Sequence, residues 1–201
     1  YYKNYWYKLE KLFENSNKLE NYFRLFLANR SYSLCNLEDV YEEFQVWYDK
    51  FRENNTIEDA LKIIYSYAVY YCDLFVRESN ELDIDAPIKQ ALIEFKKNTI
   101  EPTAPLLMEV YSLYKTSNDI SEHLVSSEDF VKIIKLFNTY TIRRNICNQR
   151  TGILTRIVPL MLKSVLDSCS GNYRNIYNYC VKYLVDISVG SVPLLNNSVT
   201  I

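Results

Sequence analysis

Residues 56–79 read TIEDALKIIYSYAVYYCDLFVRES, and this stretch decides the fold class. Between Ile63 and Cys72 it carries no charged residue, and its apolar residues recur with the 3.6-residue period of an α-helix. Thr56 followed by Asp59 is typical of a capping box and predicts where the helix begins. A helix that is apolar nearly all round is buried, so we expect this one to be the central helix of a bundle.

The same helical period continues on both sides of this stretch, and only three glycines interrupt the whole chain. Prolines, acidic first turns and the stop signal SCSGNY mark the expected helix ends. Besides 56–79, the predicted helices cover residues 5–13, 18–30, 36–51, 86–98, 101–118, 126–147, 153–169 and 173–189. Ser126 or Ser127 should cap the helix at 126–147, and Pro159 should kink or restart the helix at 153–169.

The predicted fold is therefore all-α, with about nine helices and no substantial sheet. We expect residues 1–189 to form one helical domain, and residues 190–201 to be a linker or the start of a following domain. A break near residues 80–86 would be the place for a division into two domains.

Charge and cysteine content exclude several classes of protein. With 23 basic and 25 acidic residues the net charge is −2, so any contact with nucleic acid or membrane must be local. No uncharged apolar run reaches the roughly 18 residues that span a bilayer. The chain has one histidine, His123, and no CxxC pair, which argues against a metal site. Five scattered cysteines indicate reduced core thiols and a cytoplasmic protein: Cys35, Cys72, Cys147, Cys169 and Cys180.

Motifs for catalysis and nucleotide binding are absent. The sequence contains no GxxxxGK[ST], GxGxxG, HExxH or GxSxG pattern, so we expect no catalytic residue and no cofactor in this chain. The 19 tyrosines could stack on exposed bases or pack in the core with their hydroxyl groups at its edge. Core packing is favoured, because no dense stripe of Lys and Arg accompanies them.

Four arginines lie in TYTIRRNICNQRTGILTR, residues 139–156. On the helix that starts before Phe130, Arg144 continues the apolar face, while Arg143 is rotated by about 100° from it. Arg144 should therefore point inward, where a guanidinium needs a partner, and Asp73 is the candidate for a structural ion pair. The alternative is that Arg143, Arg144, Arg150 and Arg156 contact nucleic-acid phosphate.

The segment YTIRRNICNQRTGIL resembles part of the GmrSD-type restriction endonuclease family, whose members often show an RRxIC signature followed by a polar turn containing Thr. Four more segments occur in the order found in that family's helical region: NYWYKLEKLF, NYFRLFLANR, YEEFQVWY and ALKIIYSYAVYY. Together they extend the resemblance over most of residues 1–190. Asn148 stands where the family usually has glycine after the signature cysteine.

The resemblance implies a role in phage defence. In the family the helical region follows a ParB-like domain, thought to handle nucleotide and DNA cleavage, and often precedes an HNH-type nuclease domain. The expected function is thus a helical scaffold or interaction domain that positions the flanking nuclease domains of the parent chain on modified DNA. The alternative is a nucleic-acid-binding module in which the four arginines contact phosphate, with DNA as a direct partner.

Overall fold

The computed structural model describes residues 2–14, 17–98, 100–117, 125–149 and 151–188. Over these ranges the chain forms nine α-helices and no strand, which confirms the predicted all-α fold. The helices are α1 (Tyr7–Phe13), α2 (Leu19–Ser31), α3 (Val40–Phe51), α4 (Ile57–Phe75), α5 (Ala86–Lys96), α6 (Ala104–Ser117), α7 (Ser127–Ile146), α8 (Leu154–Cys169) and α9 (Ile176–Ser188). His123, Arg150 and the predicted linker at 190–201 lie outside the described residues.

One cluster of buried apolar side chains runs from Leu9 in α1 to Leu184 in α9, so the described helices share a single core. The connection between α4 and α5 belongs to this core as well, because Leu82 is only 4% exposed and packs into it. The chain therefore has no domain break near residues 80–86.

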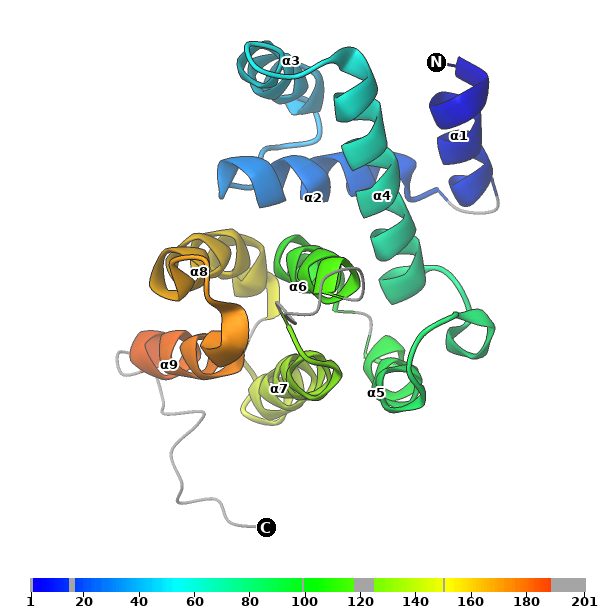
Figure 1. Ribbon diagram of the computed structural model, residues 1–201. Coiled ribbons are helices and arrows are strands. Elements are labelled where there is room, and N and C mark those ends of the chain that lie inside the picture. Colours follow the sequence, from blue (N-terminus) through cyan, green and yellow to red (C-terminus); the bar gives the residue numbers. More distant parts are fainter. Residues whose placement is uncertain (1, 15–16, 99, 118–124, 150, 189–201) are drawn as a thin grey trace.

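α6, rather than α4, occupies the centre of the bundle. It packs against α2, α4, α7 and α8, and Figure 1 shows it below α2, above α7 and beside α8. α4 buries one face, but Tyr65 and Tyr70 on its other side are only half-buried. Tyrosine counts as apolar in the pattern although its hydroxyl tolerates water, which is why the absence of charge between Ile63 and Cys72 overstated the burial of α4.

The helix starts follow local hydrogen bonding. The capping box is present: the Asp59 amide donates to Thr56 Oγ1 at 3.2 Å, and the Thr56 amide donates to Asp59 Oδ2 at 3.0 Å. Ser126 caps α7 by accepting from the Asp129 amide at 3.0 Å. These contacts lie within four residues of chain, which is why the sequence predicts them.

The restart expected at Pro159 does not occur, because α8 is continuous from Leu154 to Cys169. Pro159 lacks the amide hydrogen that would bond the carbonyl of Thr155, in the first turn of the helix. Pro159 is itself buried against the core. Packing of this face offsets the loss of one main-chain hydrogen bond near the helix start.

Tyrosines build much of the core, as the sequence predicts. Tyr67, Tyr71 and Tyr111 are buried, and each hydroxyl donates to a carboxylate at the edge of the core. The acceptors are Glu109 at 2.7 Å, Glu101 at 2.8 Å and Asp73 at 2.9 Å, respectively. These bonds join α4 to α6 and to the 3₁₀ turn Glu101–Thr103 that precedes it.

The buried tyrosines predict a sharp alkaline transition. Burial, together with the neighbouring carboxylates, raises the pKa of Tyr67, Tyr71 and Tyr111 above the ordinary value of 10.0. Each group therefore contributes stability that is fully present below pH 10 and is lost as the pH rises above 10 toward its folded pKa. We expect tyrosinate absorbance to rise and helical circular dichroism to fall together in that range. Titration of all tyrosines with the helices intact would contradict this.

The cysteines are free thiols, and Cys72, Cys169 and Cys180 are buried as expected. Burial raises the pKa of Cys72 to about 12, so this thiol stays protonated and unreactive at neutral pH. Cys147 is exposed at the end of α7 and Cys35 is only half-buried, which corrects the assignment of these two residues to the core. None of the described helices has the length and apolar character that crossing a bilayer requires.

Candidate functional site

Arg144 points into the protein, as its position on the helix predicts. It is 6% exposed, and its Nη1 lies 3.4 Å from the Tyr140 hydroxyl oxygen, one turn earlier on α7. The guanidinium carbon also lies 5.7 Å from the centre of the Tyr140 ring, within range of a cation–π interaction. Arg143, the preceding residue on α7, is half-buried. Arg144 therefore belongs to the interior of the bundle.

The predicted partner of Arg144 is engaged elsewhere. Asp73 accepts from Arg77 Nη1 at 2.9 Å and from the Tyr111 hydroxyl at 2.9 Å, and the ion pairs among the described residues match Asp73 with Arg77. The expected Arg144–Asp73 pair is thus wrong. The reason is tertiary: Asp73 faces α6 from α4, whereas α7 packs mainly on α5, α6 and α9. Arg77 lies one turn beyond Asp73 and reaches it without any long-range contact.

Arg156 is exposed on α8 and lies in a different environment from Arg144. It lines a hollow of about 270 Å³ together with Arg24 of α2. We call this the arginine hollow; its lining residues are Arg24, Tyr32, Ser33, Leu34, Thr155, Arg156 and Leu160. Arg143 and Arg144 do not line it. Of the four predicted arginines, only Arg156 contributes to the hollow within the described residues.

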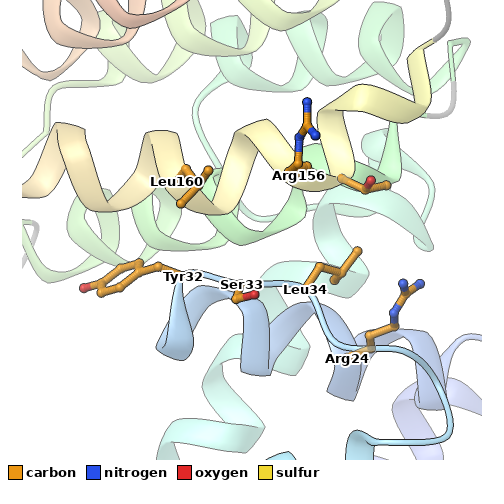
Figure 2. A pocket seen from close by; sticks show the side chains of 7 residues that line it. Arg24, Tyr32, Ser33, Leu34, Arg156 and Leu160 are labelled. Carbon is orange, nitrogen blue, oxygen red and sulfur yellow. The ribbon is translucent and has the colours of Figure 1, made fainter.

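The end of α2 shapes the arginine hollow. Tyr32 terminates the helix in the left-handed conformation, with φ of 58°, so the chain turns away from the helix axis there. Figure 2 shows the segment 32–34 running between α2 and α8, with Arg24 on one helix and Arg156 on the other. The turn therefore brings Ser33 and Leu34 beneath the first turns of α8.

Arg24 is held in place before any ligand binds. Its Nε donates to the carbonyl oxygen of Cys35 at 2.6 Å, which restrains the half-buried side chain. The two Nη groups of a guanidinium so anchored remain suited to a planar oxyanion. No acidic residue is among the described residues that line the hollow. The lining includes the side chains of Arg24, Arg156, Ser33 and Thr155, whose donors are of the kinds that bind phosphate, sulfate or carboxylate, although Figure 2 shows Arg156 extending away from the segment 32–34.

Sequence reasoning missed Arg24. It lies in NYFRLFLANR, an apolar helix segment, and nothing local distinguishes it from a solvated arginine. Its place in the same hollow as Arg156 depends on how α2 packs against α8. Only the packed structure reveals the pair.

Comparison with known proteins does not identify what the arginine hollow binds. No protein-family model, curated protein sequence or solved structure matches the chain. Within the part of the chain that the structure describes, no group of three or more His, Cys, Asp and Glu side chains is arranged to hold a metal ion. The function therefore has to be inferred from the chemistry of the site.

Proposed function

We propose that this chain is a helical interaction domain that contacts nucleic acid, with the arginine hollow holding a backbone phosphate. One observation carries the proposal: Arg24 and Arg156, from helices far apart in the sequence, line the same hollow without an acidic residue among its described lining. Arginine binds phosphate oxygens with two parallel hydrogen bonds, and such contacts fix a protein on the duplex without reading its sequence.

The resemblance of the arginine-rich segment to the GmrSD-type restriction family suggests the kind of protein in which this contact would be used. In a GmrSD-type restriction protein, the domain would hold the nuclease domains of the parent chain on modified DNA. That role in phage defence belongs to the cytoplasm, where buried thiols such as Cys72 stay reduced. Scaffolding and phosphate contact are compatible, because a scaffold that binds the DNA backbone sets the position of the domains joined to it.

The structure changes the residues to which this function is assigned. Arg156 is kept from the predicted set and Arg24 is added. Arg144 is assigned to the interior, where its burial keeps it from the DNA surface. Phosphate contact by Arg143 and Arg150 stays a prediction.

Salt-dependent binding tests the proposal. We expect the chain to bind duplex DNA at low salt, and Arg24→Ala and Arg156→Ala each to reduce the slope of log affinity against log salt by about 0.9, because one phosphate contact is lost. The double variant should lose about twice that. Binding is measured by fluorescence anisotropy over a series of salt concentrations.

The matched control is Arg174→Ala, which removes an exposed arginine outside the hollow. It lowers the net charge by the same amount as either test variant and should leave the slope nearly unchanged. DNA binding that is absent in the parent, or that falls equally in all three single variants, would exclude the hollow as the phosphate site.

A further inference from the structure

The turn into α3 and the first residues of this helix present exposed apolar side chains. Leu37 is 48% exposed and Tyr41 is 69% exposed. Main-chain hydrogen bonds wind residues 36–40 into helical turns that lead into α3, so side chains four residues apart lie near one another. Glu38 and Glu42 are therefore neighbours as well, and both are exposed. We call Leu37, Glu38, Tyr41 and Glu42 the α3 face.

The α3 face carries an unbalanced negative charge. Residues 36–46 include no Lys or Arg, and their acidic residues are Glu38, Asp39, Glu42 and Glu43. Within the described residues, neither Glu38 nor Glu42 forms an ion pair. Like charges four residues apart on a helix repel each other, so a basic partner would relieve this repulsion. Nucleic acid is not such a partner, because its phosphates are themselves negative.

α8 presents the opposite charge. Arg156 and Lys163 are exposed, and Leu160 between them is 50% exposed. The spacings of four and three residues place all three on one side of the helix, which we call the α8 face. Residues 151–164 include no Asp or Glu, and neither basic residue forms an ion pair within the part of the chain that the structure describes. Figure 2 shows Arg156 extending away from the segment 32–34, so a partner outside the molecule can reach its guanidinium group.

The two faces do not meet within one chain. α3 packs on α2, α2 packs on α8, and Figure 1 shows α3 above α2 and α8 below it. None of the ion pairs among the described residues joins α3 to α8. Each face thus leaves charges unpaired and apolar side chains exposed, and each offers the charge that the other lacks. A net charge of −2 means that copies of the chain repel each other only weakly.

We propose that the α3 face of one copy of the chain docks on the α8 face of a second copy. The carboxylates of the α3 face pair with the two basic side chains of the α8 face, and the apolar side chains of both faces pack between these pairs. Ion pairs at an exposed contact are weak and screened by salt, so the association is reversible and weakens as the salt concentration rises. The inference does not depend on the phosphate contact proposed above, although Arg156 belongs to both sites.

Analytical ultracentrifugation of the chain without DNA tests the proposal. We expect the weight-average mass of the parent to rise with protein concentration, and to rise less at high salt. Glu42→Lys and Arg156→Glu should each weaken the association by at least about tenfold, because each places like charges opposite each other. Both side chains are exposed, so the melting temperature of each variant should stay close to that of the parent.

Mixing the two variants tests which faces meet. Glu42→Lys keeps a native α8 face and Arg156→Glu keeps a native α3 face, so one copy of each can form the native contact. We expect the equimolar mixture to associate with nearly the affinity of the parent, whereas each variant alone stays monomeric at the same concentration. Two variants that had merely lost their fold would not restore the association.

The matched controls are Asp186→Lys and Lys182→Glu, each of which reverses one charge on an exposed side chain of α9. They change the net charge by the same amounts as Glu42→Lys and Arg156→Glu, and they should self-associate like the parent. The proposal is overturned if the parent stays monomeric at all concentrations, if the mixed variants stay monomeric, or if the controls weaken the association as much as the test variants do. Because DNA is absent throughout, these outcomes are independent of whether the arginine hollow binds phosphate.

Discussion

Replacing Asp73 with alanine is expected to destabilise the fold by about 3 kcal/mol. Asp73 is 7% exposed, and its carboxylate accepts from Arg77 and from the hydroxyl of Tyr111, a residue that is fully buried. The variant leaves that hydroxyl without its acceptor, and this is the main cost. The Arg77 side chain is 41% exposed and can return to water, so the ion pair adds little. The melting temperature should fall by about 6–12 °C.

Double-mutant cycles identify the partner of Asp73. We expect Asp73→Ala and Arg77→Ala to be non-additive, because the side chains share a hydrogen bond. Asp73→Ala and Arg144→Ala should add within about 0.5 kcal/mol, since these residues have separate partners. Tyr111→Phe is the milder control, because it leaves Asp73 paired with Arg77. Strong coupling between Asp73 and Arg144 would restore the pair predicted from the sequence and refute the one observed here.

Phe26→Ala is expected to cost about 3–5 kcal/mol and to loosen α3 before the rest of the bundle. Phe26 is fully buried, and its ring centre lies 5.2 Å from that of Trp47 on α3 and 5.8 Å from that of Tyr67 on α4. α3 has no fully buried residue of its own, so its attachment depends on half-buried rings such as Trp47 packing on α2. Removing the ring of Phe26 opens a cavity at that contact.

Tryptophan fluorescence measures this effect. The chain has two tryptophans, so a Trp6→Phe background leaves Trp47 as the reporter. In Phe26→Ala the Trp47 emission should shift to the red at denaturant concentrations where helical circular dichroism is still native. Phe26→Leu keeps most of the volume and should show a much smaller shift. Coincident fluorescence and dichroism transitions in Phe26→Ala would show that α3 unfolds with the core.

The positions of the helices could be read from the sequence because the signals are local. The period of apolar residues, the Thr56–Asp59 capping box and the Ser126 cap each involve residues within one or two turns. The inward direction of Arg144 follows from the same rule, since a helix repeats its faces every 3.6 residues. Helix phase determines whether a side chain is buried, but it contains no information about which helix lies opposite.

The tertiary structure decided the pairings between helices. Asp73 accepts from Tyr111 rather than pairing with Arg144, and Arg24 lines the same hollow as Arg156. Each outcome depends on how whole helices pack, which is the sum of many weak contacts spread over the core. The sequence by itself therefore determined an all-α protein with its helices in place and Arg144 inside. Packing alone determined the arginine hollow, because it is lined by residues that only the assembled bundle brings together.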